Sequence, residues 1–227
     1  MMKRFILASG SPRRRALLHL FGLPFEVVVA DVDEELVTDP NPAGNVIATA
    51  RLKAEAVATS LSHSPALILA ADTTVALDGQ MLNKPAGPKD ARRMLQQLRG
   101  RRHQVHTGII LLETDTGRVV TDVASVEVPM RQYSNAEIEA YIATGDPLDK
   151  AGAYAIQHPT FKPVANLADC YAAVVGLPLC HVARALRRLD VNTPQEIAPA
   201  CQRYHAYQCP VYANILAQTP PISRWHP

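Results

Sequence analysis

The most apolar run in the first half of the chain is Ala66-Leu67-Ile68-Leu69-Ala70-Ala71, and it ends on Asp72-Thr73-Thr74. A short, continuous apolar segment of this kind is typical of a strand buried on both faces of a sheet. In α/β sheets, ligands bind outside the carboxyl ends of such strands. We therefore predict a central strand whose end presents Asp72 to a ligand; the alternative is that Asp72 only caps a turn.

The segments around this strand alternate between strand and helix patterns. Strands are predicted over 5–8, 25–29, 104–113 and 119–129, with a hairpin over 75–82. Helices are predicted over 13–20, 46–61, 89–99 and 134–144, and residues 39–42 are interpreted as a proline-bearing linker. This order predicts an α/β fold with a mixed twisted sheet and flanking helices.

Composition and charge narrow the possible functions. The 227 residues are 48% hydrophobic and 19% charged, which suits a globular chain with a continuous core. A formal net charge of only +2 excludes charge-driven coating of nucleic acid, so we expect no nucleic-acid partner. No apolar run approaches the roughly 20 residues that cross a bilayer. We therefore expect no membrane partner and a cytoplasmic location.

The end of the chain differs from the rest. Residues 190–227 contain six prolines and the only tryptophan, so we predict an extension that follows a domain of residues 1–189. The four cysteines lie in the last quarter of the chain without a C-x-x-C pair, and we expect reduced thiols. The alternative is a metal site on one helix face from Cys201, His205 and Cys209, although it would supply only three ligands.

The first candidate site is Ser9-Gly10-Ser11-Pro12-Arg13-Arg14, where a strand feeds a turn that opens a helix. Ser11 is a good N-cap and Pro12 a good first helical residue. Amides at a helix N-terminus favour an anion, and arginine is well shaped to bind phosphate. The turn is therefore a candidate phosphate site. The alternative is a capped helix with solvated arginines.

Other polar residues extend this chemistry. Glu34 lies in an acidic loop, Lys53 in a predicted helix and Lys84 in a loop before a proline. The small residues of segment 149–157 would let the backbone approach a ligand, and its last residue, Gln157, offers both a donor and an acceptor to a nucleobase. Cations, a carboxylate and an amide are together the groups that hydrolysis of a phosphoanhydride needs.

Five motifs, in this order, resemble the Maf family of nucleotide pyrophosphatases: Ala8-Ser9-Gly10-Ser11-Pro12-Arg13-Arg14, Ala71-Asp72-Thr73, Lys84-Pro85, segment 149–157 and segment 174–179. The resemblance spans about residues 5–189. It implies hydrolysis of a nucleoside triphosphate to the monophosphate and pyrophosphate, with a divalent cation (Mg²⁺, Mn²⁺ or Co²⁺). It also implies two lobes around a cleft, a fold shared with inosine triphosphate pyrophosphatases, and a homodimer.

The resemblance also implies roles for single residues. Asp72 matches the proton acceptor, with Lys53 and Lys84 as further catalytic groups. Ser9 and Arg14 match phosphate-binding positions, and Glu34 matches a metal ligand that acts together with Asp72.

Three positions separate the branches of this family. Arg13, Thr73 and Gln157 match the branch that acts on dTTP and UTP, and a neutral amide suits the edge of uracil or thymine. The alternatives are the branch that acts on 7-methyl-GTP or other modified nucleotides, and a catalytically weak nucleotide-binding protein. Two departures from the family pattern bear on this choice: His158-Pro159 where glycines are usual, and Asn83 where Glu is usual.

Overall fold

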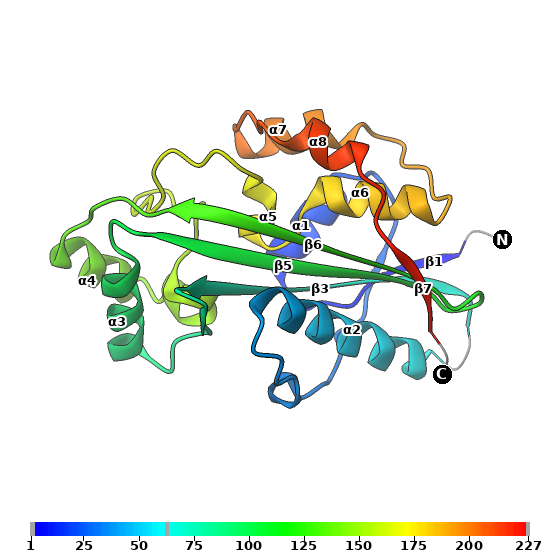
Figure 1. Ribbon diagram of the computed structural model, residues 1–227, viewed down its shortest axis with the longest axis horizontal. Coiled ribbons are helices and arrows are strands. Elements are labelled where there is room, and N and C mark those ends of the chain that lie inside the picture. Colours follow the sequence, from blue (N-terminus) through cyan, green and yellow to red (C-terminus); the bar gives the residue numbers. More distant parts are fainter. Residues whose placement is uncertain (1–2, 62–63, 226–227) are drawn as a thin grey trace.

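A seven-stranded mixed sheet runs through the computed structural model, which describes residues 3–61 and 64–225 (Figure 1). The spatial order is β2-β1-β3-β5-β6-β7, and β4 pairs with β3. Strand β1 is parallel to both β2 and β3, whereas the other pairs are antiparallel. The strands are β1 (Arg4–Leu7), β2 (Glu26–Val27), β3 (Ala66–Leu77), β4 (Gln80–Leu82), β5 (Arg102–Glu113), β6 (Arg118–Pro129) and β7 (Ile222–Arg224).

Helices cover both faces of the sheet, as predicted for this fold class (Figure 1). Helix α2 lies on one face, α1, α5 and α6 lie on the other, and α7 and α8 pack outside α6. Helices α3 and α4 pack together near one end of the long β5–β6 hairpin. The helices are α1 (Pro12–His19), α2 (Pro42–Ser60), α3 (Pro88–Leu98), α4 (Asn135–Ala143), α5 (Tyr171–Val175), α6 (Leu179–Arg188), α7 (Ile197–His205) and α8 (Tyr212–Ala217), with single 3₁₀ turns at η1 (Glu34–Leu36), η2 (Asp146–Asp149) and η3 (Ala151–Ala153).

Alternating side chains of β3 build two apolar cores. Ile68 and Ala70 face α2, where Ala50 and Val57 pack against them. The neighbouring residues of β3 face the opposite core, which contains the buried leucines of α1. Full burial of each large aliphatic side chain contributes about 1.5–3 kcal/mol, so both faces anchor β3 in the middle of the sheet.

Strand β3 is longer than the sequence predicted. It does not end at Asp72 but continues to Leu77, so the prediction of a strand end at this residue was wrong. The cause is β5, a strand of 12 residues that stays paired with β3 from Leu67 to Ala76. This pairing includes the polar residues 72–74 of β3, so they remain part of the strand. The predicted hairpin is confirmed: Asp78 and Gly79 both have positive φ, as a type I′ turn requires.

Two other boundaries also differ from the prediction. Helix α2 begins at Pro42, inside the predicted linker, because the Asn41 side chain accepts hydrogen bonds from two amides of the first turn. Strand β2 has only two residues, both exposed. The first helix, by contrast, is confirmed with Ser11 as its N-cap, and the Ser134–Glu137 capping box is present at the start of α4.

A buried arginine that forms an ion pair with the sheet also binds residues of segment 190–227. Arg184 of α6 contacts Asp122 of β6 through both side-chain oxygens, at 2.6 Å each. The same guanidinium donates to the Ile215 carbonyl and to Gln218, which fixes α8 against α6. The last strand of the extension, β7, pairs with β6 at the edge of the sheet.

The predicted alternative of a metal site on one helix face does not fit the extension. Helix α7 ends at His205, and Ala206 adopts a left-handed conformation with φ of 47°. Cys209 therefore lies beyond the helix that carries Cys201. Among residues 3–61 and 64–225, no three His, Cys, Asp or Glu side chains are placed to hold a metal ion. All four cysteines are free thiols.

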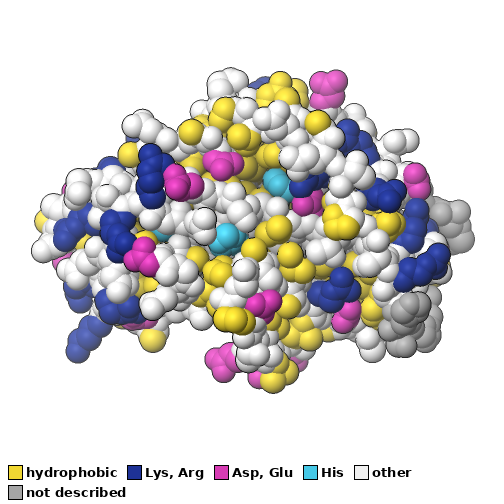
Figure 2. Space-filling model, viewed as in Figure 1, with side chains coloured by type: hydrophobic (Ala, Val, Ile, Leu, Met, Phe, Trp, Pro, Cys, Tyr) yellow, Lys and Arg dark blue, Asp and Glu magenta, His cyan; other side chains and the backbone are white. Residues whose placement is uncertain are grey.

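The visible surface carries charges of both signs. In Figure 2 the Lys and Arg side chains are interspersed with Asp and Glu instead of forming one continuous basic region on this face. Within the described part of the chain, no helix is long and apolar enough to cross a membrane.

Candidate active site

The site forms where β3 extends past its parallel neighbour. Strand β1 ends at Leu7, and the last bond on that side runs from the Ala8 amide to the Leu69 carbonyl. Strand β4 pairs with β3 only from Val75 onward. Residues 70–74 of β3 therefore have an edge that neither strand covers. This stretch includes the polar triplet that starts at Asp72.

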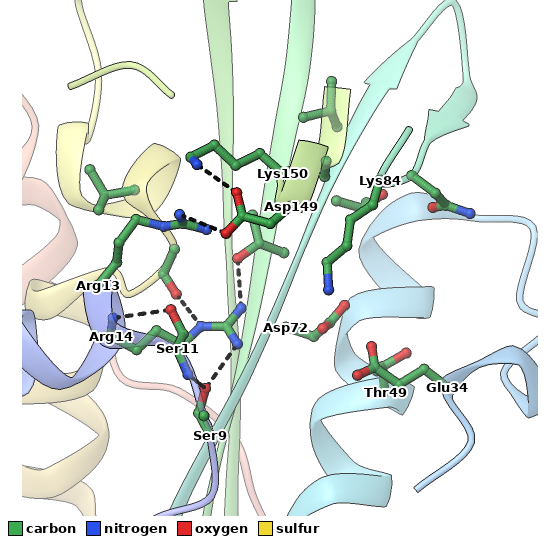
Figure 3. A pocket seen from close by; sticks show the side chains of 18 of the residues that line it. Ser9, Ser11, Arg13, Arg14, Glu34, Thr49, Asp72, Lys84, Asp149 and Lys150 are labelled. Atoms are coloured by element: carbon green, nitrogen blue, oxygen red, sulfur yellow. Dashed lines mark hydrogen bonds and ion pairs between the residues drawn. The ribbon is translucent and has the colours of Figure 1, made fainter. Parts of the chain in front are cut away.

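A cavity of about 950 Å³ opens over this edge. Its walls come from the turn between β1 and α1, from η1, α2, β3 and β4, and from the η2–η3 segment (Figure 3). The nine residues selected from the sequence all line it: Ser9, Arg13, Arg14, Glu34, Lys53, Asp72, Thr73, Lys84 and Gln157. The structure thus gathers them at one place, whereas their individual roles remain predictions.

Lys53 links two carboxylates in this cavity. Its Nζ lies 2.8 Å from Asp72 Oδ1 and 3.0 Å from Glu34 Oε1. Lys53 is only 8% exposed, because it lies on the buried face of α2. The Asp72 Oδ2 atom accepts no hydrogen bond from the described residues. One carboxylate oxygen is therefore held in place while the other is available to a ligand or to water.

Arg14 is held by neutral oxygens. Its Nε donates to the Gly176 carbonyl at 2.8 Å, and its two terminal nitrogens donate to Ser9 Oγ at 3.3 Å and to Thr73 Oγ1 at 3.1 Å. Desolvation lowers the pKa of Arg14, an effect that attraction to Asp72 opposes. An arginine remains protonated near neutral pH, and this one has no ion-pair partner among the described residues. It is therefore a fixed positive charge suited to an anion.

The turn before α1 adds backbone donors to this charge. Ser11 Oγ accepts from the Arg14 amide, and Ser9 Oγ accepts from the Ser11 amide at 3.3 Å. The amides of Gly10 and Arg13 have no hydrogen-bond partner within the described residues. Gly10 has no positive φ, and a Cβ there would meet Val29 at 3.5 Å, an ordinary van der Waals contact, so neither the backbone nor the space at this position requires glycine. Free amides at a helix start are a suitable site for phosphate oxygens.

The part of the cavity wall opposite the turn before α1 carries further polar and charged groups. Lys84 is exposed and projects into the cavity, as Figure 3 shows. Gln157 is also exposed and belongs to the same wall. Asp149 lies 2.6 Å from Lys150 and 3.8 Å from Arg13, so it joins this wall to the turn before α1.

Several lining residues were not selected from the sequence. Asn45 and Thr49 precede Lys53 at intervals of four residues, so the three form a polar stripe along one face of α2. This spacing was a usable signal. Thr107 does not line the cavity and gave no such signal: it is fully buried on β5, bonds to Thr73 at 2.9 Å and donates to the Ala173 carbonyl. It thereby positions the hydroxyl that Arg14 contacts.

The donor set suits a divalent cation that is shared with a phosphate ligand. Glu34 and Asp72 both form an ion pair with Lys53, so their carboxylates lie in the same part of the cavity. Carboxylate oxygens are ligands that Mg²⁺ prefers. No third carboxylate, His or Cys of the described residues completes a site made by protein alone. Mg²⁺ commonly binds through one or two carboxylates together with substrate phosphates, so these two residues fit that arrangement.

Comparison with known proteins agrees with the motifs. Residues 4–189 match the profile of a family described as Maf-like protein. The chain belongs to the Maf family. Proteins named dTTP/UTP pyrophosphatase are similar to it: that of Bacillus cytotoxicus is 44% identical (83% of this chain, 97% of that protein) and that of Geotalea uraniireducens is 45% identical (81% and 94%). The protein of the same name from Dictyoglomus thermophilum is 44% identical (85% and 99%).

Among solved structures, the Staphylococcus aureus Ham1 protein resembles this Maf family member, with 17% identity and a TM-score of 0.41 over 56% of this chain and 72% of that one. The family match ends at residue 189, before α7, α8 and β7.

Proposed function

We propose that this Maf family member is a nucleoside triphosphate pyrophosphatase that hydrolyses dTTP and UTP to the monophosphate and pyrophosphate. The structural observation that carries the proposal is the cavity in which Arg14, Lys53 and Asp72 converge from three elements. The names of relatives that share 44–45% identity over most of their length support the choice of substrate.

In the proposed reaction, the triphosphate lies along the turn before α1. The Gly10 and Arg13 amides and the Arg14 guanidinium bind phosphate oxygens, and Lys84 reaches the same anion from the opposite wall. The Arg14 guanidinium is fixed by its hydrogen bonds before the substrate arrives, so it can stabilise the charge that develops at phosphorus with little reorganisation.

Asp72 is the proposed general base. Lys53 holds its Oδ1, and Oδ2 accepts a proton from the water that attacks the α-phosphorus. Lys53 keeps the carboxylate oriented toward the free edge of β3. Glu34 and Asp72 would hold a divalent cation together with the phosphates, and that cation would neutralise charge and polarise the phosphoryl oxygens.

We assign base selection to Arg13, Thr73 and Gln157. Gln157 lines the cavity from an exposed position, and its amide can pair with both the O4 and N3–H groups of uracil or thymine. The Thr73 hydroxyl also bonds to Arg14 and Thr107, so in addition it positions the guanidinium that binds phosphate.

A nucleotide panel tests this proposal. Purified protein is supplied in turn with Mg²⁺, Mn²⁺ and Co²⁺, and pyrophosphate release is measured for dTTP, UTP, dCTP, GTP and 7-methyl-GTP. We expect the highest kcat/KM for dTTP and UTP. A preference for 7-methyl-GTP would assign the protein to the other branch, a change that the His158-Pro159 departure could cause. Binding of UTP without metal-dependent product would indicate a nucleotide-binding protein with little or no catalysis.

We further propose a division into a catalytic domain of residues 1–189 and an extension of residues 190–227, working as a homodimer in the cytoplasm. The position at which the family match ends supports the division, and the four free thiols suit a reducing compartment. Light scattering coupled to gel filtration measures the oligomeric state, and a monomeric mass would refute the dimer.

A further inference from the structure

The four cysteines of the chain, distant in sequence, meet in one small cavity. Cys170 and Cys180 come from the part of the chain that the family match covers, at the start of α5 and in α6. Cys201 and Cys209 come from the extension, in α7 and in the loop before α8. The cavity holds only about 10 Å³, so the thiols meet across a nearly closed contact between the two parts of the chain.

Two of these thiols stand on chain segments that are bound to each other. Cys170 and Cys209 both line the cavity, and hydrogen bonds that involve no sulfur fix the segments that carry them. The Tyr207 hydroxyl donates to the carbonyls of Leu167 and Asp169, both at 2.9 Å. The Cys209 amide donates to the Gln202 side chain at 3.1 Å. The segments that carry Cys170 and Cys209 are therefore held together around one cavity in the folded protein without a covalent link.

The pair has unequal members. Cys209 is partly exposed, and its pKa is lowered by its interaction with Cys170 and by the amides of Val211 and Tyr212. Cys170 is only 5% exposed, and its interaction with Cys209 together with burial raises its pKa. A reachable thiolate beside a protected thiol is the usual arrangement of an attacking and a resolving cysteine.

The other two cysteines lack these features. Burial raises the pKa of both Cys180 and Cys201 to about 12, so neither is suited to be the thiolate that first attacks a peroxide near neutral pH. They share the cavity with the reactive pair and are therefore matched controls for it.

We propose that Cys170 and Cys209 form a hydroperoxide-sensitive pair that closes into a disulfide and links the extension to α5. The Cys209 thiolate attacks one peroxide oxygen and becomes a sulfenic acid, while the other oxygen leaves and is protonated to water. The Cys170 sulfur then attacks the Cys209 sulfur, and the hydroxyl leaves as a second water. One hydrogen peroxide is thus reduced to two waters while two thiols become one disulfide.

This bond would act at the base of the candidate site. Cys170 immediately precedes the five-residue helix α5, and Gly176, which follows that helix, is the residue whose carbonyl accepts from Arg14. The proposal rests on the arrangement of the four cysteines and on their unequal reactivity, and it does not depend on the proposed nucleotide chemistry.

Peptide mapping tests the proposal. Fully reduced protein is treated with hydrogen peroxide, free thiols are alkylated, and the digest is analysed without reduction. We expect a linked Cys170–Cys209 peptide that forms in Cys201→Ser and disappears in Cys209→Ser. Because Cys209 is partly exposed, its replacement should leave the fold intact. Closing a loop of this size should also raise Tm by roughly 5–10 °C, reversibly with a thiol reductant.

Three results would overturn the proposal. The first is a link that involves Cys180 or Cys201 in place of this pair. The second is oxidation of Cys209 to a sulfinic or sulfonic acid with no linked peptide. The third is a rise in Tm on peroxide treatment that persists in Cys209→Ser.

Discussion

Gly108 lies directly opposite Asp72 across the β3–β5 pair, and the absence of a side chain there lets α2 approach the sheet. A Cβ at this position would lie 2.8 Å from backbone atoms of Val46 and Ile47. Since Lys53 stands on the same helix, this close contact also sets the distance between its amine and Asp72. One glycine in the sheet thus controls the geometry of a lysine and a carboxylate in the site.

Replacing this glycine should therefore disturb both stability and the site. In Gly108→Ala the methyl group meets backbone instead of a flexible side chain, so α2 must shift. We expect a loss of about 1–3 kcal/mol in the free energy of unfolding, measured by urea titration, with a fall in nucleotide hydrolysis. Gly87→Ala is the control, because a Cβ there meets nothing within 4 Å. Equal stability of the two variants would contradict the predicted role of Gly108.

Asp72→Asn tests the general base. The amide keeps the shape of the side chain but cannot take a proton from water, so turnover should fall by about a hundredfold or more. Pyrophosphate release at saturating UTP measures this effect. Asp78→Asn is the matched control, because Asp78 is an exposed turn residue paired with Arg101 outside the cavity. If turnover survives in Asp72→Asn, Asp72 is not the base.

Much of the backbone was predictable because its signals are local. Ser11 and Pro12 mark the start of α1, and the Ser134–Glu137 capping box marks α4; each works through neighbours within one helical turn. The end of β3 was not predictable in this way, since its polar stretch depends on a partner strand more than 30 residues away in the chain. The polar residues 72–74 alone suggested that the strand ends there, whereas β3 continues past them.

The candidate site likewise has a part that the sequence predicted and a part that it did not. The residue types in the Ser9–Arg14 turn and at Asp72 already indicated phosphate chemistry. The contacts that orient them did not follow from sequence: Arg14 donates to a carbonyl 162 residues away, and Lys53 joins Glu34 to Asp72 across two loops. The meeting of the four cysteines is likewise a product of tertiary packing.

Arg14→Lys tests whether the guanidinium shape matters. A lysine keeps the positive charge but cannot donate at once to Gly176, Ser9 and Thr73. We expect kcat/KM for dTTP and UTP to fall by about tenfold or more. Arg15→Lys is the control, because Arg15 is exposed on the same helix and does not line the cavity. Full activity of Arg14→Lys would show that charge alone suffices at this position.

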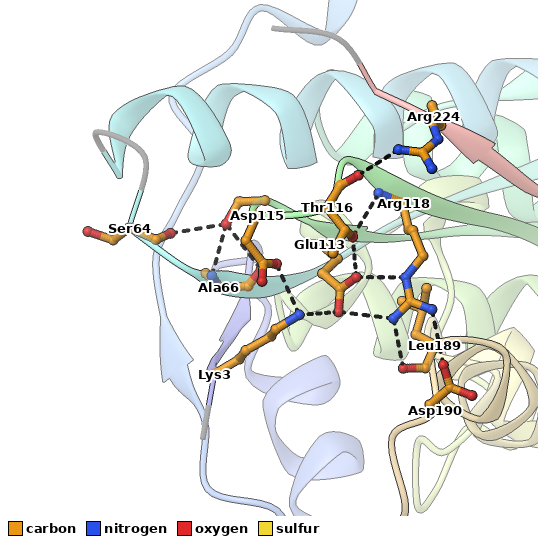
Figure 4. Close-up of polar contacts among 11 residues, drawn as sticks. Lys3, Ser64, Ala66, Glu113, Asp115, Thr116, Arg118, Leu189, Asp190 and Arg224 are labelled. Atoms are coloured by element: carbon orange, nitrogen blue, oxygen red, sulfur yellow. Dashed lines mark hydrogen bonds and ion pairs between the residues drawn. The ribbon is translucent and has the colours of Figure 1, made fainter. Parts of the chain in front are cut away.

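The ionisation of Glu113 should make the free energy of unfolding depend on pH. It is only 2% exposed and lies in a network with Lys3, Thr116 and Arg118, while Arg118 also pairs with Asp190 (Figure 4). Burial alone would raise the pKa of Glu113, but hydrogen bonds from Arg118, Lys3 and Thr116 outweigh it and lower the pKa from 4.5 to about 2. The folded state therefore holds the ionised form more strongly than the unfolded chain does.

The contribution of Glu113 to stability is complete above the unfolded pKa and is lost as the pH falls from about 4.5 toward 2. It amounts to a free energy on the order of 3 kcal/mol. In urea titrations across this range, the wild type should lose more stability than Glu113→Gln, so the two curves converge at low pH. Glu127→Gln, an exposed change on β6, should follow the wild type. Parallel curves for wild type and Glu113→Gln would show that this carboxyl does not couple folding to pH.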